Sequence, residues 1–477
     1  MSGQKPRQIA ARVLQQRRAT GAFIEDSLEI ALAEAQLSPA DRALCQEITY
    51  GVVRWQITLD WLIACKTAGR PQKPALQNFL RLGLYQIFWL DRIPGHAAVN
   101  ETVELARQSG FGAQAGFVNA VLRGYLREAD ATKKLLGELK ASQPALGWSH
   151  PEWLVARWQK RWGTARTAQL MEWNNTPPKT YARVNMLKFR EGRRASIPNQ
   201  IEKSETATRR PSQDEYLGKL LETWRAENVE YDFVGQASRL SQILKDKNGD
   251  RQDACPTSFE NLVFELKSHP PLASLESFQQ GWFYIQDPGT LLAPCKLGPQ
   301  PGETILDLCA APGGKTTFIA QLMNNQGRIV AMDHSVERLK LIRENCVRLG
   351  VTCVETVLPS ALDSRPSTDF DRILVDAPCS NTGVMRRRVD LRWRIRPAEI
   401  KRLCDVQRDL LRQAARRLKP GGILIYSTCS LEPEENGEVV KQFLAEHIDF
   451  KLESEQELLP FVDNVDGAYV ARLKRLP

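Results

Sequence analysis

From about residue 281 onward, this 477-residue chain alternates between short apolar strands and amphipathic helices. The strands are ETILDLCA, GRIVAMD, TCVETVL, DRILVDAP and GGILIYST, and helices such as SVERLKLIRENCVRLG and PAEIKRLCDVQRDLLRQAARRL separate them. Apolar strands that alternate with helices predict a doubly wound, parallel α/β sheet of the Rossmann type. The ligand of such a sheet lies outside the carboxyl ends of the strands, so functional residues are expected in the loops that follow them.

The rest of the chain follows other patterns. In residues 1–135, apolar side chains recur every three or four positions, as in DSLEIALAEA, ALQNFLRLGLYQIFWL and FVNAVLRGYLRE, which predicts helices with one buried face. Residues 145–275 combine the amphipathic helix HPEWLVARWQKRWG, the strand YARVNMLK and polar stretches at 190–215 and 238–257. We therefore expect an all-helical domain (1–135), a small α+β domain with linker helices and polar insertions (145–275), and a Rossmann-like α/β domain (276–477).

The chain is basic, with 65 Lys and Arg against 56 Asp and Glu and a net charge of +9. A surplus of cations favours a polyanionic partner such as RNA, because neutralised phosphates release their counterions. The ten cysteines form no CxxC pair and no HExxH motif occurs, so no metal site is expected. The sequence has neither a signal-peptide core nor an apolar run long enough for a membrane span, so we expect a cytoplasmic protein.

The loop DLCAAPGGKTT, residues 307–317, joins the first strand of the α/β region to a helix. Its small residues let the backbone approach a ligand closely, and the helix N-terminus favours negative groups. Asp333 ends the next strand, where a dinucleotide-type fold places the carboxylate that binds ribose hydroxyls. A phosphate-binding P-loop is disfavoured, because its pattern requires glycine at position 309 and the chain has Cys309 there.

Two further loops at the carboxyl ends of strands carry a cysteine: DAPCSNTG, residues 376–383, and STCSLEPEENG, residues 427–437. A thiolate that adds to C6 of cytosine makes C5 nucleophilic toward a sulfonium methyl group, so cysteine suits the formation of 5-methylcytosine. Asp376 can hydrogen-bond the base and stabilise the adduct. These residues alone do not decide whether Cys379 or Cys429 attacks. A zinc deaminase is disfavoured, because its PCxxC signature lacks the second cysteine here.

The segments RVNMLK, FYIQDPGT, CAAPGGK, DAPCSNTG, STCS and DGAYVARL together resemble the RNA 5-methylcytosine methyltransferase family, in particular its bacterial small-subunit rRNA branch (RsmB-like). The resemblance covers most of the chain and likens the helical domain to a NusB-like RNA-binding fold. It implies a class I methyltransferase domain at the C-terminus and S-adenosyl-L-methionine as cofactor. It also implies that the substrate is a cytosine of 16S rRNA, free or at an early stage of assembly.

The same resemblance implies roles for single residues. Cys429 of the TC motif is the nucleophile, Cys379 of the PC motif assists product release, and Asp376 lies where cofactor and base meet. Asp333 binds the ribose of the cofactor. The remainder of the cofactor site is formed by Cys309, Ala310, Ala311, Pro312, Gly313, Gly314 and Lys315.

RNA contacts are expected in two places. RVNMLK resembles an RNA-side motif of the family, which places Arg183 and Asn185 at the RNA. The segment MRRRVDLRWRIRP follows a catalytic loop and combines arginines with an aromatic ring, which suits phosphate contact and base stacking. Its candidate residues are Arg386, Arg387, Arg388, Arg392 and Trp393.

The chain departs from the family at two places. Pro359 and Ser360 stand where the family carries a Gly-Asp pair whose aspartate contacts adenine, and Val389 replaces a proline in the arginine-rich segment. Two alternative functions remain open at this point. One is the same chemistry on tRNA, and the other is an RNA-binding ribosome-assembly factor that has lost catalysis.

Overall fold

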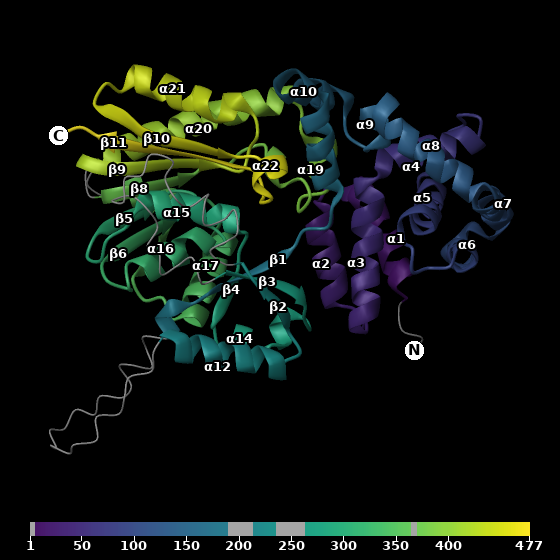
Figure 1. The fold of residues 1–477 in the computed structure, drawn as a ribbon, viewed down its shortest axis with the longest axis horizontal. Coiled ribbons are helices and arrows are strands. Elements are labelled where there is room, and N and C mark those ends of the chain that lie inside the picture. The colour runs from purple at the N-terminus through teal and green to yellow at the C-terminus, as the bar shows by residue number, and fades with distance from the viewer. Residues whose placement is uncertain (1–4, 189–212, 235–262, 364–369) are drawn as a thin grey trace, which may run out of the picture. The chain divides into compact units, whose positions relative to one another are not determined.

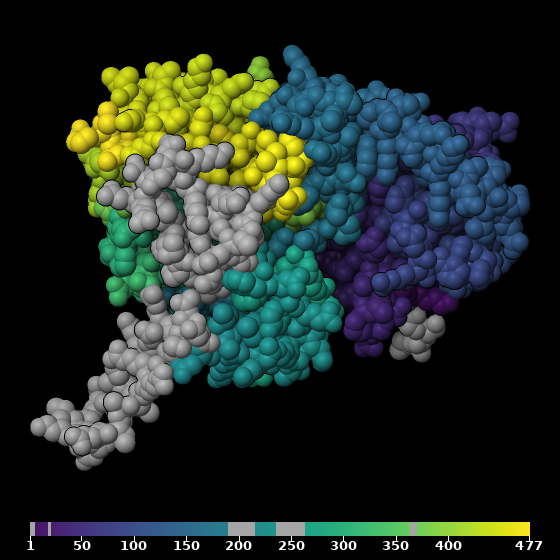
Figure 2. Space-filling model, in the orientation of Figure 1, coloured from purple at the N-terminus to yellow at the C-terminus, as the bar shows by residue number. Residues whose placement is uncertain are grey.

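The computed structural model describes residues 5–188, 213–234, 263–363 and 370–477 (Figure 1). Contacts within the chain divide it into two units. The first is helical and consists of Met1–Pro177 together with Met385–Arg394, and the second consists of Pro178–Val384 and Ile395–Pro477. Figure 2 shows the surface of both units in the same colours.

The helical unit is built around a core of aliphatic side chains such as Ile48, Leu59 and Leu122. Four of its described helices begin with a proline, where the missing N–H group costs no hydrogen bond. The helices are α1 (Pro6–Thr20), α2 (Ile24–Ala33), α3 (Pro39–Arg54), α4 (Gln56–Lys66), α5 (Pro74–Trp89), α6 (Gly95–Ala106), α7 (Ala115–Arg127), α8 (Ala129–Ser142), α9 (Pro144–Gly147) and α10 (Glu152–Asn175). The predicted helical fold is confirmed, and contacts within the chain group α10, which the sequence assigns to the middle region, with this unit.

The second unit contains a seven-stranded sheet with the strand order β10-β11-β9-β8-β5-β6-β7. The five strands from β7 to β9 are parallel, as predicted, and β11 and β10 add to the β9 edge in antiparallel fashion. A short connection suffices between antiparallel strands, and only residues 459–467 join these two. The strands are β5 (Thr304–Asp307), β6 (Arg328–Met332), β7 (Val354–Val357), β8 (Phe370–Asp376), β9 (Leu418–Thr428), β10 (Phe450–Leu458) and β11 (Ala468–Arg475).

Both faces of this sheet are covered by helices, so its strands are apolar on both sides. Ile305 and its neighbours on one face pack against α15 (Leu292–Leu297), α16 (Gly314–Leu322) and α17 (Val336–Leu349). Leu306 and its neighbours on the other face pack against α20 (Pro397–Arg417) and α21 (Gly437–Glu446) (Figure 1). This arrangement brings the loops after β5, β6, β8 and β9 to one edge of the sheet.

The second unit also contains a small antiparallel sheet of order β2-β3-β1-β4. Its strands are β1 (Thr180–Val184), β2 (Glu230–Phe233), β3 (Val263–Ser268) and β4 (Phe283–Ile285), and α12 (Gln213–Ala226) and α14 (Glu276–Gln279) accompany them. The buried ring of Trp224 lies at the centre of its core, against Phe264 and Phe283. The predicted α+β fold is therefore confirmed, and β4 lies beyond the predicted boundary at residue 275.

Candidate active site

The two predicted cysteines lie together at the carboxyl edge of the seven-stranded sheet. Strands β8 and β9 are parallel neighbours in which Asp376 pairs with Ser427, so the loops that follow them start side by side. The sulfur atoms of Cys379 and Cys429 are 3.3 Å apart. The Cys429 thiol also donates a hydrogen bond of 2.9 Å to Asn381 Oδ1. Cys379 is buried and Cys429 is partly exposed, so Cys429 is the thiol that a substrate can reach.

The two thiols differ in their electrostatic surroundings. The hydrogen bond with Cys429 and burial together raise the pKa of the Cys379 thiol well above its usual value. Cys379 therefore stays protonated and can act as a hydrogen-bond donor toward its neighbour. A neutral donor at this distance stabilises a negative charge on the other sulfur.

Lys315 and Asp376 form an ion pair beside the cysteines. Lys315 Nζ is 2.6 Å from Asp376 Oδ2, and the Ser427 hydroxyl donates to the other carboxylate oxygen at 2.8 Å. Burial is the largest single influence on Lys315 and lowers its pKa, but the charge and hydrogen bond of Asp376, together with the nearby Cys429 and Asp307, outweigh it and the net shift is upward. Lys315 is thus a permanent cation that holds the Asp376 carboxylate at the end of β8.

The predicted cofactor loop runs from the end of β5 to the start of α16. Gly313 has a φ of +100°, a conformation that strains any residue with a side chain. Asp333, buried at the end of β6, accepts hydrogen bonds of 3.3 Å from the backbone N–H groups of Ala311 and Ser335. Its carboxylate also lies 3.4 Å from Arg338 Nη1. The loop and the predicted ribose carboxylate are therefore one connected structure.

Asp307, at the start of this loop, was not singled out from the sequence. Its side chain is buried, and Oδ2 accepts a hydrogen bond of 2.7 Å from the Thr316 hydroxyl. Oδ1 has no hydrogen-bond partner within the described part of the chain. Burial raises the pKa of this carboxyl group to about 7. The only sequence signal was its place at the carboxyl end of the first parallel strand.

A helix begins at Pro359 and Ser360, the two positions where the sequence comparison expects a Gly-Asp pair. Pro359 begins the short helix α18 (Pro359–Asp363) directly after β7 and Leu358, and Ser360 is exposed. A hydroxyl thus stands where the family carries the carboxylate.

The small sheet uses Arg183 and Asn185 for its own attachment within the second unit. Arg183 donates to Gly314 O and to the Thr317 hydroxyl, each at 3.2 Å, and burial lowers the pKa of its guanidinium to about 9. Asn185 donates to Gly281 O and Leu349 O, each at 2.8 Å. Both side chains are buried and are not available to RNA in this structure, so we do not propose them as RNA contacts.

The arginine-rich segment belongs mainly to the interior of the helical unit. Arg392 is fully buried on α19 (Leu391–Arg394), and the buried Arg386 lies 3.9 Å from the centre of the Trp173 ring. Trp393 Nε1 donates to Val53 O at 2.8 Å. Arg387 is partly exposed and Arg388 is exposed. Of the expected RNA contacts in this segment, Arg388 is thus the most exposed, and Trp393 is partly exposed like Arg387.

Four backbone or side-chain oxygens hold the Arg392 guanidinium in place. They accept hydrogen bonds of 2.8 to 3.3 Å and belong to Arg54, Ser149, Asn174 and Asn175. The sequence predicts an RNA contact for this arginine, because its segment follows a catalytic loop and contains an aromatic ring. The partners that satisfy it come from distant parts of the chain, which the local sequence does not reveal.

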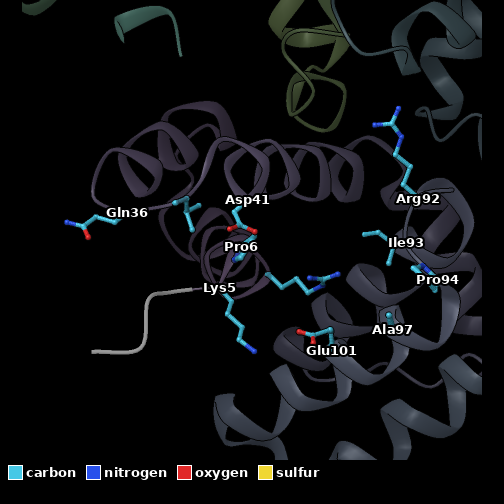
Figure 3. Close-up of a pocket in the computed structure, with 11 residues that line it drawn as sticks. Lys5, Pro6, Gln36, Asp41, Arg92, Ile93, Pro94, Ala97 and Glu101 are labelled. Carbon is cyan, nitrogen blue, oxygen red and sulfur yellow. The ribbon is translucent and has the colours of Figure 1, made fainter. Parts of the chain in front are cut away.

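The helical unit has a cavity of about 630 Å³ between the start of α1, the segment before α3 and the start of α6 (Figure 3). Lys5, Arg92, Asp41 and Glu101 line it, so its wall carries both signs of charge. Arg7 also lines it and donates to Gln86 Oε1 at 2.7 Å. None of the residues expected from the sequence to act in catalysis lies in this cavity.

The described residues contain neither a candidate metal centre nor a candidate membrane-spanning helix. Within the described ranges, His, Cys, Asp and Glu side chains nowhere gather as they would to hold a metal ion. None of the described helices combines the length and the apolar character that crossing a membrane requires.

The sheet order, with the last strand inserted antiparallel beside β9, and the cysteine pair at its edge define a class I methyltransferase domain. Comparison with known proteins makes this specific. A family model described as 16S rRNA methyltransferase RsmB/F matches residues 294–474. The NusB family model matches residues 4–127, and the model for an RsmF/B-like ferredoxin-like domain matches residues 150–210.

Full-length relatives agree with these matches. The chain is 34% identical to the probable ribosomal RNA small subunit methyltransferase B of Synechocystis, over 98% of this chain and 99% of that one. It is 33% identical to the corresponding probable enzyme of Bacillus subtilis, over 93% and 89%. It is 35% identical to ribosomal RNA small subunit methyltransferase B of Cronobacter sakazakii, over 91% and 89%. The chain therefore belongs to the RsmB/F family of 16S rRNA methyltransferases and is an enzyme.

Solved structures support the fold. The crystal structure of PH0851 aligns with 99% of this chain and all of that one, with a TM-score of 0.71 at 23% identity. A methyltransferase homologue from Pyrococcus horikoshii aligns with 70% of this chain and 97% of that one, with a TM-score of 0.51 at 27% identity.

Proposed function

We propose that this enzyme transfers the methyl group of S-adenosyl-L-methionine to C5 of a cytosine in 16S rRNA, in the cytoplasm, through a covalent bond between Cys429 and C6. The observation that carries the proposal is the pair of thiols 3.3 Å apart at the ends of β8 and β9, with Asp376 and Lys315 beside them. Cytosine C5 is a weak nucleophile, and a thiol that can add reversibly to C6 is what the reaction requires.

The residues of the loop after β5 fit the cofactor. Asp307 Oδ1 is a buried acceptor without a partner in the described structure, and such a group is costly unless a ligand supplies a donor. We assign the cofactor to Cys309, Ala310, Ala311, Pro312, Gly313, Gly314 and Lys315, with Asp333 on the ribose. When bound, S-adenosyl-L-methionine supplies a methyl group on a positively charged sulfur.

Residues of the chain carry out the attack on C6, the orientation of the base and the release of the product. Cys429 gives up its proton to water, its sulfur bonds to C6, and the ring gains nucleophilic character at C5. Asp376, fixed by Lys315 and Ser427, accepts hydrogen bonds from the amino edge of the base. After methylation the C5 proton passes to water, the C5–C6 double bond forms again, and the bond from Cys429 to C6 breaks with its electron pair on the sulfur. We assign Cys379 to this release, and the 3.3 Å between its thiol and the departing sulfur supports the assignment.

The names of the relatives favour small-subunit rRNA over tRNA as the substrate, because those proteins are called ribosomal RNA small subunit methyltransferase B. We further propose that the RNA is free or at an early stage of assembly. Since Arg388 is exposed and Arg387 partly so, we assign these two arginines to phosphate contact.

The test uses methyl-labelled S-adenosylmethionine with full-length wild type, Cys429→Ala and Cys379→Ala, each on a small-subunit rRNA transcript and on tRNA. We expect label in 5-methylcytosine of the rRNA with wild type and none with Cys429→Ala. Cys379→Ala should accumulate an RNA adduct that survives denaturant. An adduct with Cys429→Ala would reverse the roles of the cysteines, and label in tRNA alone would overturn the substrate assignment.

A further inference from the structure

The carboxylate of Glu435 lies between the two cysteine loops. Glu435 ends a short turn (Pro433–Glu435) after β9, and its side chain is 0% exposed. Its Oε1 accepts a hydrogen bond of 2.8 Å from the backbone N–H of Ser380, the residue after Cys379. Its Oε2 accepts one of 2.5 Å from the hydroxyl of Ser430, the residue after Cys429. One side chain thus bonds to the neighbours of both thiols.

Further contacts close this arrangement. Gln407, on α20, donates to Glu435 Oε1 at 3.1 Å and to the carbonyl of Pro378 at 3.0 Å. The hydroxyls of Ser380 and Ser430 lie 3.0 Å apart. The carboxylate therefore receives a backbone N–H, a hydroxyl and an amide, and the two loops meet around it.

The backbone fixes the loops at a second point. The N–H of Gly383 donates to the carbonyl of Cys429 at 2.9 Å, and a Cβ at position 383 would lie only 2.7 Å from that oxygen. Glu435 and Gly383 thus hold the segment 379–383 against the segment after β9 at both of its ends. Cys379 directly precedes the first attachment, and the backbone of Cys429 is the acceptor in the second.

Burying a carboxylate at this place costs desolvation energy, which a neutral side chain would avoid. Burial raises the pKa of Glu435, which means that the surroundings oppose its charge. The hydrogen bonds offset that cost, and charge-assisted bonds are shorter and stiffer than neutral ones. Their effect is to fix a distance between two loops more tightly than apolar packing would.

We propose that Glu435 is a positioning residue that sets the separation of the Cys379 and Cys429 thiols by tying Ser380 to Ser430. The structural part of this proposal stands on the contacts alone. Its catalytic consequence rests on the proposed function, because a thiol must lie near the departing sulfur for efficient release.

The experiment measures how fast the two thiols form a disulfide, because this rate depends on their separation. Diamide accepts two electrons and two protons from a pair of thiols, so Cys379 and Cys429 join in a disulfide and the reagent becomes the hydrazine. The rate is followed in the full-length protein by mass spectrometry of the linked peptides. Glu435→Gln and Glu435→Ala are compared with wild type, and Glu438→Gln, an exposed glutamate on the first turn of α21, is the matched control.

We expect the linking rate to fall at least about tenfold in Glu435→Ala, since a misplacement near 1 Å can cost a reaction about a hundredfold. Glu435→Gln keeps one acceptor oxygen and should fall between Glu435→Ala and wild type, and Glu438→Gln should match wild type. Thermal unfolding shows whether Glu435→Ala is folded; if it is not, Glu435→Gln decides. In methyl transfer, kcat should fall while KM for S-adenosylmethionine stays unchanged, because Asp333 is untouched.

An unchanged rate of disulfide formation in folded Glu435→Ala would overturn the proposal. If Glu435→Ala does not fold, an unchanged rate in Glu435→Gln would overturn it. A fall in both variants and in Glu438→Gln would also overturn it, because the effect would not be specific to this carboxylate. The linking assay needs neither RNA nor cofactor. Slower linking in a protein that makes no 5-methylcytosine would therefore refute the proposed function and leave the positioning role of Glu435 intact.

Discussion

Asp307 illustrates how position alone alters a carboxyl group. The residue ends β5 with its side chain buried, and its pKa is raised from 3.8 to about 7. The folded protein thus holds this proton more tightly than the unfolded chain does. The stabilisation is complete below the unfolded pKa of 3.8 and is lost as pH rises through about 7.

The substitution Asp307→Asn should remove this pH dependence, because an amide cannot ionise and still accepts the Thr316 hydroxyl bond. Between pH 5 and pH 8 we expect wild type to lose stability relative to Asp307→Asn by an amount on the order of 2 kcal/mol. Thermal unfolding of both proteins at the two pH values measures this. Parallel changes in melting temperature would contradict the assignment.

Single residues also mark where sequence reasoning succeeds. Asp333, Asp376, Cys379 and Cys429 all follow apolar strands, and parallel strands end at one edge, so their gathering was predictable. Glu435 was not, because a glutamate in a polar segment is usually solvated. Its burial depends on the pairing of β8 with β9, which lies outside the local sequence.

At the scale of elements, the close approach of two loops depends on a missing side chain. Gly383 lies between the cysteine loops, and a Cβ there would be 2.6 Å from Gly467 O and 2.7 Å from Cys429 O. Both neighbours are backbone atoms, which cannot move aside without moving their loops. The strands underneath are fixed by seven-stranded pairing, so any adjustment falls on the loops.

The substitution Gly383→Ala should therefore displace the loop of Cys379 or Cys429 while the sheet stays folded. We expect methyl transfer to rRNA to fall by at least about tenfold, in line with the sensitivity of reactions to small misplacements. Gly437→Ala is the control, because a Cβ there meets its nearest atom at an ordinary 3.8 Å. Equal rates for the two variants would show that the loops tolerate the change.

The elements themselves were predicted best where their pattern was long. The helices of the first unit and the parallel strands followed from apolar spacing. The three-residue strand β4 did not, since a short strand gives little periodicity and is recognised by its pairing with β1.

At the scale of the whole molecule, the chain leaves the methyltransferase fold after Val384 and returns at Ile395. In between, Val389 joins the core of the helical unit, and Asp390 forms ion pairs with Arg17 and Arg394. The Val389 side chain thus fills part of this core. Some of the positive charges in this segment therefore form hydrogen bonds and ion pairs inside the helical unit.

Replacing two arginines of this segment by alanine should therefore affect different properties, stability in one case and rRNA binding in the other. Arg392→Ala leaves several buried acceptors without their donor and should lower the free energy of unfolding of the helical unit by about 2 to 4 kcal/mol. Arg388→Ala should leave the melting temperature unchanged and weaken rRNA binding, most clearly at low salt. Thermal unfolding and binding titrations at two salt concentrations measure both. A stable Arg392→Ala protein would show that its hydrogen bonds matter little.

The segment Met385–Arg394 limits how the chain can be shortened. The polypeptide crosses between the two units three times, after Pro177, after Val384 and after Arg394. A gene fragment that ends at residue 177 would encode the helices without Val389, Arg392 and Trp393, which complete them. A protein cut at residue 177 would therefore lack side chains that pack and bond inside the helical unit, and its helices should unfold more easily than in the full chain.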